Sequence, residues 1–119
     1  MTDAHIAPPL VLVDEAAGAA LEDWGPLEEA TGPAMTASGL MSWSHDGSEM
    51  GIWECTPGPS HWVQEQNEFI HVLSGSMTVT PTDGEAVEIG PGDSALFPAG
   101  WTGTWEIHET LRKVYVIFL

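Results

Sequence analysis

The sequence predicts an all-β jelly-roll barrel over residues 39–119, preceded by an extended N-terminal arm over residues 1–38. From Gly39 onward, short β-rich runs recur about every 8 to 12 residues between turn residues, a spacing typical of β-sandwiches and barrels. The stretches SHDGS and PTDGE contain Asp-Gly, which supplies the positive φ angles of tight hairpin turns. No segment after Gly39 repeats its apolar residues with a helical period.

The predicted strands of the barrel are the short runs GLMSW, MGIWEC, FIHVL, MTVT, AVEI, SALF, TWEI and VYVIFL. The arm is instead rich in Ala, Pro, Gly and acidic residues. It holds one β-like run, LVLV at residues 10–13, followed by a weak Ala-rich helical turn. We expect its apolar residues to pack on the barrel or on a partner chain; they are Leu10, Leu12 and Trp24.

The composition fits one small globular domain with an acidic surface. The chain has 119 residues, of which 43% are hydrophobic and six are tryptophans, enough for a packed core. Eighteen acidic residues against two basic ones give a formal net charge of −16. Nucleic acids and anionic membranes are excluded as partners, because binding them needs Lys and Arg. The charge has two interpretations, a solvated acidic surface or a cationic ligand.

We expect the protein to be cytoplasmic. Its N-terminus lacks the basic region, apolar block and small-residue cleavage site of a secretory signal. No apolar run approaches the roughly 20 residues of a membrane span. The single cysteine, Cys55, cannot form an internal disulfide and is expected to be a buried, unreactive thiol.

Two motifs make the predicted barrel more specific. In the first, HWVQEQNEFIHVLSG, His61 is followed by Glu68 and Gly75; in the second, GDSALFPAGW, a glycine precedes Pro98. Together they resemble the paired motifs of the cupin superfamily. The flanking segments GIWECTPG, EIGPGDSALFPAGWTGTWE and ETLRKVYVI resemble small single-domain cupins grouped with (S)-ureidoglycine aminohydrolase. The resemblance implies an RmlC-like barrel, a double-stranded β-helix whose interior holds a divalent metal or a small ligand.

The same resemblance implies an incomplete metal site. Metal cupins supply two histidines and a glutamate from the first motif and a third histidine from the second. Here His61 and Glu68 match two of these ligands, whereas Val63 and Gly103 stand at the other two positions. A divalent Mn, Zn, Fe or Ni ion at His61 and Glu68 is therefore one possibility, and a cupin that has lost its metal is the other.

The ligand spacing of the aminohydrolase itself gives a second register. In that register the first three ligand positions fall on Trp62, Gln64 and Glu68. A glutamine and a carboxylate could share an oxygen-loving cation such as Mn²⁺, but no histidine is supplied. The aminohydrolase activity is not expected for this chain.

Without a metal, Glu68 needs another cation, because burying an unpaired carboxylate is very costly. The candidates are Lys113, Arg112 and a protonated His61. Lys113 shares its strand face with Tyr115, so the hypothesis is that Lys113, or failing that His61, pairs with Glu68. Such a pair is either an acid/base catalyst or a structural ion pair, and Lys113 could also lie on the surface.

Two classes of function remain open. The first is an enzyme acting on a small polar nitrogenous or carboxylated metabolite, with Glu68 and Lys113 as candidate catalytic residues. The second is a non-catalytic module that binds a small molecule. In both, Trp62, Gln64 and Tyr115 are expected to line the ligand pocket, although tryptophans also fill small barrel cores and interfaces. The family resemblance further implies a homodimer.

Overall fold

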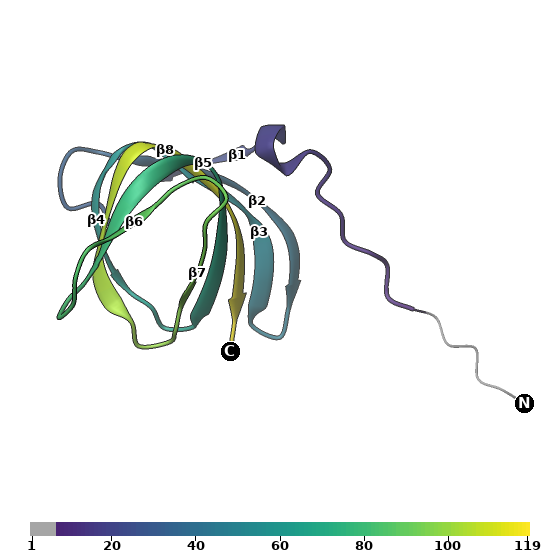
Figure 1. Cartoon of the computed structure of the whole chain (residues 1–119). Helices are drawn as coiled ribbons and strands as arrows, with labels where there is room; N and C mark the ends of the chain where they lie inside the picture. Colours follow the sequence, from purple (N-terminus) through teal and green to yellow (C-terminus); the bar gives the residue numbers. More distant parts are fainter. Residues whose placement is uncertain (1–6) are drawn as a thin grey trace, which may run out of the picture.

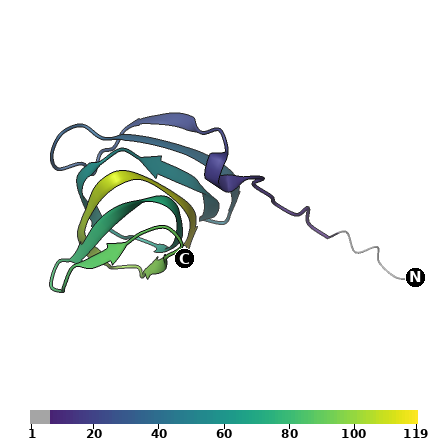
Figure 2. The same cartoon turned by 45° about the horizontal axis from the view of Figure 1, so that its top comes forward.

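The computed structural model describes residues 7–119 and confirms the predicted all-β jelly-roll fold (Figure 1). Its strands form one antiparallel sheet that curls into a barrel (Figure 2). They are β1 (Glu22–Pro26), β2 (Thr36–His45), β3 (Ser48–Cys55), β4 (Gly58–Val63), β5 (Asn67–Pro81), β6 (Val87–Ile89), β7 (Ser94–Phe97) and β8 (Thr102–Phe118). One short 3₁₀ helix, η1 (Ala16–Gly18), precedes them.

The long strands β5 and β8 connect the rest of the sheet, because each pairs with three other strands. The last part of β8 pairs with β3, which sets Lys113 opposite Trp53. The first part of β8 pairs with β4, which sets Trp105 opposite Ser60. β5 pairs with β8 over most of its length, and on its other side with β7 and then β6. The bend of both long strands is visible in Figure 2.

These two strands are longer than predicted, because each contains two of the predicted runs. FIHVL and MTVT are parts of β5, and TWEI and VYVIFL, except its last residue Leu119, are parts of β8. The register between β5 and β8 shifts repeatedly between Val72 and Met77, which indicates bulges. Gly75 lies there at φ 85°, and a Cβ on it would lie 2.7 Å from Leu111 Cα and closer still to the Thr110 carbonyl oxygen. The SGS stretch therefore marks a bend within one strand.

Two strands, β1 and β4, were not predicted. Both contain proline, Pro26 in β1 and Pro59 in β4. β1 pairs with β2 alone, and β4 pairs along its length with β8 but has only an isolated bridge, between Ser60 and Ala30, on its other side. Proline is tolerated at such edges because its missing N–H leaves no ladder bond unmade. The composition of these segments therefore gave little strand signal.

Only the later part of the N-terminal segment contacts the barrel. Residues 7–15 extend away from it in Figure 1, and β1 joins the sheet beside β2. Between them, the Arg112 guanidinium donates hydrogen bonds of 3.0 Å to the carbonyl oxygens of Ala16 and Ala19. Its Nε also contacts Glu54 at 3.0 Å. Residues 1–6 of the predicted arm lie outside the described residues.

The core occupies the inner face of the barrel, where inward-facing residues alternate with outward-facing ones. Its apolar members come from six strands and include Trp53, Ile70, Val72, Met77 and Trp105. Two side chains of the charged residue types, Glu68 and Lys113, are buried with them at 7% and 2% exposure. Within residues 7–119, no helix has the length and apolarity to cross a membrane.

Candidate functional site

A cavity of about 190 Å³ lies in the barrel. Four of the six tryptophans of the chain line it: Trp24, Trp53, Trp62 and Trp105. Its polar groups are Glu49, Gln64, Glu68, Lys113 and Tyr115. The cavity therefore combines aromatic walls with a few convergent polar groups, as small-molecule sites do.

Strand register explains why these polar groups meet. Ile117 on β8 lies opposite Glu49 of β3 on one side and Glu68 of β5 on the other. Directly opposed residues of antiparallel strands project from the same face, so both carboxylates point inward. Lys113, Tyr115 and Ile117 are two residues apart along β8, so their side chains lie on the same face of the strand.

Glu68 and Lys113 form a buried ion pair. Lys113 Nζ lies 2.8 Å from Glu68 Oε2, and Gln64 Nε2 donates to Glu68 Oε1 at 3.2 Å. The ammonium also lies 4.6 Å from the ring centre of Trp53 and 4.4 Å from that of Trp105. Carboxylate, amide and aromatic faces together compensate both charges, which would otherwise be costly to bury. Of the three candidate cations for Glu68, the structure pairs it with Lys113.

Tyr115 and Glu49 form a second polar contact in the cavity. The Tyr115 hydroxyl donates a hydrogen bond of 2.8 Å to Glu49 Oε2. Burial, this hydrogen bond and the charges of Glu49 and Glu68 raise the pKa of Tyr115 well above its usual value, so the phenol stays protonated. Sequence reasoning missed Glu49, because only the β3–β8 register shows that it faces inward.

Trp24 is another residue that sequence reasoning did not place in the pocket. It lies on β1, and its ring packs over Gly39 of β2, where an added Cβ would lie 2.6 Å from Trp24 Cζ2. The missing side chain at Gly39 thus makes room for this part of the cavity wall. A glycine inside a predicted strand was the available signal.

The inner tryptophans form a packed wall. Trp62 stacks on Trp105 with ring centres 4.4 Å apart, and Trp53 meets both rings edge-on. Trp62 Nε1 donates to Ser60 Oγ at 2.8 Å, which fixes the ring. The Trp105 indole N–H is buried and has no hydrogen-bond partner among the described residues. Nearby Cys55 is also buried, and burial raises the pKa of its thiol to about 11, so it stays unreactive at neutral pH.

The structure does not bring His61 and Glu68 together. His61 and Val63 are exposed on β4, whereas Trp62 between them and Gln64 after them line the cavity. The inward-facing register is thus the one formed by Trp62, Gln64 and Glu68. Spacing alone could not reveal this, because it does not fix which face of a strand turns inward.

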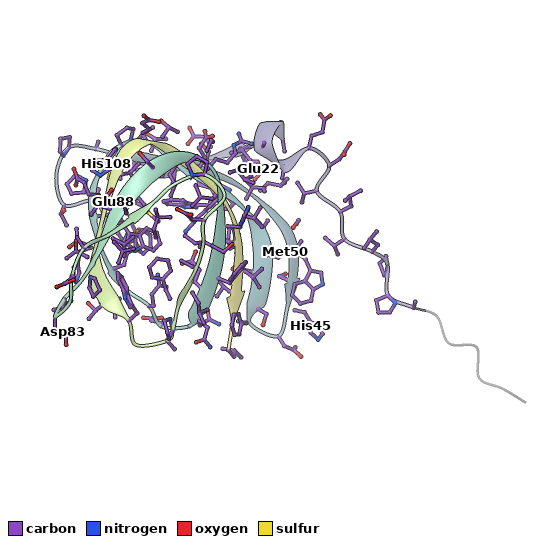
Figure 3. All side chains as sticks on the ribbon, in the orientation of Figure 1. Glu22, His45, Met50, Asp83, Glu88 and His108 are labelled. Carbon is purple, nitrogen blue, oxygen red and sulfur yellow. The ribbon has the colours of Figure 1, made fainter. Side chains whose placement is uncertain are left out.

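The other described histidines also lie away from the cavity. His71 contacts Ser94 on the barrel surface at 2.8 Å. His108, labelled in Figure 3, contacts Thr78 at 2.7 Å. His45 lies at the hairpin between β2 and β3, beside Asp46.

The residues present do not fit a divalent metal. Within residues 7–119, no group of three or more His, Cys, Asp or Glu side chains converges on a possible ion site. The Glu68 carboxylate is engaged by the Lys113 ammonium, which would repel a metal cation. At Gly103, a side chain would lie 2.6 Å from Trp101 Cη2 and closer to the Thr80 carbonyl oxygen, so no ligand could stand there without rearrangement. No reaction step is therefore assigned to a metal.

The family follows from the sequence of the barrel. The family model of the EutQ-like cupin domain matches residues 44–115. The chain belongs to the EutQ-like cupin family. Outside this family match, a comparison with proteins of curated function found none that resembles the chain.

Solved cupins and DUF861 proteins share the fold. A DUF861 family protein from Pseudomonas syringae superposes with a TM-score of 0.78 at 17% identity, covering 86% of this chain and 46% of that one. This cupin thus spans less than half the length of that relative. A DUF861 family protein from Thermotoga maritima is 36% identical over 56% of this chain and 76% of its own, with a TM-score of 0.55. The EutQ protein of Clostridium difficile gives 0.66 at 18% identity, over 78% of this chain and 75% of its own.

Proposed function

We propose that this cupin binds a small organic molecule in its tryptophan-walled cavity, next to the Lys113–Glu68 ion pair. The observation that carries the proposal is this pair itself, buried and contacting the cavity. Replacing a buried ion pair by packed apolar residues is often neutral or stabilising, so stability alone gives little reason to keep one. A role in contacting a ligand is a better reason.

The size of the cavity limits the ligand. Its volume of about 190 Å³ is below the roughly 300–1,000 Å³ of pockets for drug-sized ligands. A metabolite with a few heavy atoms fits, such as a small polar nitrogenous or carboxylated compound. Its polar atoms would meet Gln64, Lys113 or Glu49, and its carbon atoms would contact the indoles.

A second candidate function is acid–base catalysis by the same pair. Lys113 and Glu68 are 2.8 Å apart, and both line the cavity, so a proton could pass between either of them and a bound substrate. In that case Glu68→Gln protein would retain bound substrate unchanged, whereas the wild type would convert it. Mass spectrometry of the released ligand distinguishes the two results.

We propose that the resemblance to (S)-ureidoglycine aminohydrolase does not include its activity. The inward-facing positions of that register hold Trp62, Gln64 and Glu68, so the first carboxylate and the histidine are replaced. We propose that the Lys113 ammonium provides the positive charge beside Glu68 that a metal provides in metal cupins.

Tryptophan fluorescence tests the proposed binding, because four tryptophans line the cavity. Titration with a panel of small polar metabolites should identify one that changes the emission and saturates. Ile117→Phe fills the cavity and should abolish this change. Val116→Phe adds the same bulk at the neighbouring position on the opposite face of β8 and should preserve it. Binding that survives Ile117→Phe would place the ligand elsewhere and contradict the proposal.

A further inference from the structure

The cavity carries one negative charge that no basic residue compensates. Lys113 balances Glu68, and the protonated phenol of Tyr115 is neutral. Glu49 accepts a hydrogen bond from Tyr115, but within residues 7–119 no Lys, Arg or His forms an ion pair with it. Two carboxylates and one ammonium leave the cavity with a net charge of −1.

An anionic ligand would find no free cation in this cavity. The chain has two basic residues, and both are engaged: Arg112 contacts Glu54 at 3.0 Å, and Lys113 contacts Glu68 at 2.8 Å. The net charge of −16 on the whole chain repels anions at long range and attracts cations. Charge at both scales therefore favours a positively charged ligand.

The aromatic walls favour the same kind of ligand. The faces of indole rings attract cations, and the Lys113 ammonium already lies 4.4 Å from the centre of Trp105 and 4.6 Å from that of Trp53. Trp24, 42% exposed, and Trp62 add further aromatic surface on the cavity lining. Aromatic faces that line a cavity bind quaternary ammonium groups, and here a carboxylate, Glu49, lines the same cavity.

We propose that the ligand of the cavity is a small organic cation, an amine or a quaternary ammonium compound, held by Glu49 and the tryptophan walls. This inference rests on the proposed function and names the chemistry of its ligand. Glu49 and Glu68 lie on opposite sides of Ile117, so their backbones are about 10 Å apart, two strand spacings. Glu68 compensates the charge of the Lys113 ammonium at 2.8 Å, so Glu49 is the carboxylate of the cavity that remains for a ligand cation.

Two probes of equal shape isolate the effect of charge. Choline and 3,3-dimethylbutan-1-ol differ in a positively charged nitrogen against a neutral carbon. Isothermal titration calorimetry on the wild-type protein should give a choline affinity about tenfold higher than that of the alcohol. Equal affinities, or tighter binding of the alcohol, would overturn the inference.

Glu49→Gln tests which group provides the preference. The amide oxygen can still accept the Tyr115 hydrogen bond, so the fold should be retained, which the melting temperature checks. The variant should bind choline and the alcohol equally. Glu109→Gln, an exposed position on β8, changes the net charge by the same amount and should keep the tenfold preference. Equal losses in both variants would reduce the effect to general electrostatics and overturn the role of Glu49.

A second pair of variants applies even if Glu49→Gln fails to fold. Trp24→Leu keeps an apolar side chain but removes the aromatic face, and should weaken choline binding several-fold. Trp43→Leu is the control, since Trp43 is 41% exposed, as Trp24 is 42% exposed, but does not line the cavity. Unchanged choline binding in Trp24→Leu would contradict an aromatic enclosure at this position.

The proposed function can survive the failure of this inference. If the cavity binds the alcohol as well as choline, or binds only neutral metabolites in a manner blocked by Ile117→Phe, the cavity is a ligand site without a preference for cations. If Ile117→Phe affects no ligand, the proposed function fails as well.

Discussion

At the scale of single residues, the Lys113 ammonium determines the character of the cavity. It contacts one carboxylate and two indole rings and is 2% exposed. Both members of the pair are almost fully buried, so removal of one leaves the other charge without its main compensation. The free energy of unfolding should report this directly.

Lys113→Met should lower the free energy of unfolding by about 3–5 kcal/mol, because the Glu68 carboxylate loses its cation. The double variant Lys113→Met/Glu68→Met should recover most of this loss, since no charge then remains buried. Arg112→Met breaks the more accessible contact with Glu54 and should cost only about 1–2 kcal/mol. Urea unfolding measures all three. A double variant as unstable as the single one would show that the pair itself stabilises the fold.

Stability should also fall at alkaline pH. Burial raises the pKa of Cys55 from 9.0 to about 11, an effect that the charge of Lys113 partly offsets. A thiol with a raised folded-state pKa contributes stability below its unfolded pKa and loses it as the pH rises toward the folded value. Between pH 9 and about 11 the loss should reach about 2–3 kcal/mol, with a further share from Tyr115. Cys55→Ala should reduce the slope measured by urea unfolding; an unchanged slope would contradict the assignment.

Part of the site could be predicted from single residues. Glu68 lies within a barrel motif and needs a cation if it is buried. The chain has only two Lys and Arg residues, and the alternation of side chains along β8 puts Lys113 on the same face as Tyr115. The positions of His61, Glu49 and Trp24 could not be predicted in this way. They depend on the register of β4, β3 and β1, and a shift of one residue turns every side chain to the opposite face.

At the scale of elements, the bend of β5 depends on Gly75. Its φ of 85° is unfavourable for other residues, and an added Cβ would meet the backbone of β8 at Leu111. Gly75→Ala should therefore lower the free energy of unfolding by at least about 3 kcal/mol.

Gly90→Ala is the matched control for this prediction. No heavy atom lies within 4 Å of the position that its Cβ would take, and its φ lies outside the left-handed range. Its free energy of unfolding should stay within about 1 kcal/mol of the wild-type value. Equal costs for the two variants would show that the bend does not require glycine.

Each predicted run overlaps a strand of the structure, but the sequence did not show which runs join into one long strand. A bulged strand has turn residues at its bend, so FIHVL-SGS-MTVT has the same composition as two strands and a loop. Pairing with the equally long β8 makes it one strand, and this pairing joins residues far apart in the sequence. Strands β1 and β4 show the opposite case. They contain proline and have the composition of loops, yet both pair in the sheet.

At the scale of the whole molecule, the arm carries apolar residues that the barrel does not cover. Leu10 and Leu12 are 88% and 74% exposed. We expect a homodimer in which this arm covers the sheet of the partner chain, because exposed apolar segments gain free energy by burial. Sedimentation equilibrium should show a dimer for the full chain and a monomer after deletion of residues 1–13. A monomeric full chain would contradict this expectation.

The fold class was accessible from the sequence because it depends on features spread over the chain. Turn residues, short β-rich runs and the two motifs agree, and the single antiparallel sheet of the structure matches that expectation. The contents of the cavity were less accessible, because they require side chains from β1, β3, β4, β5 and β8 to meet.

The central claim is that an ion pair, in place of a metal, organises a cavity that binds an organic ligand. Native mass spectrometry of protein purified without metal-affinity chromatography tests it most directly, because one spectrum reports metal ions and bound organic molecules together. We predict the mass of the chain without metal, and an adduct with a small organic compound that Ile117→Phe removes. A stoichiometric metal ion that is lost in Glu68→Ala would contradict the account.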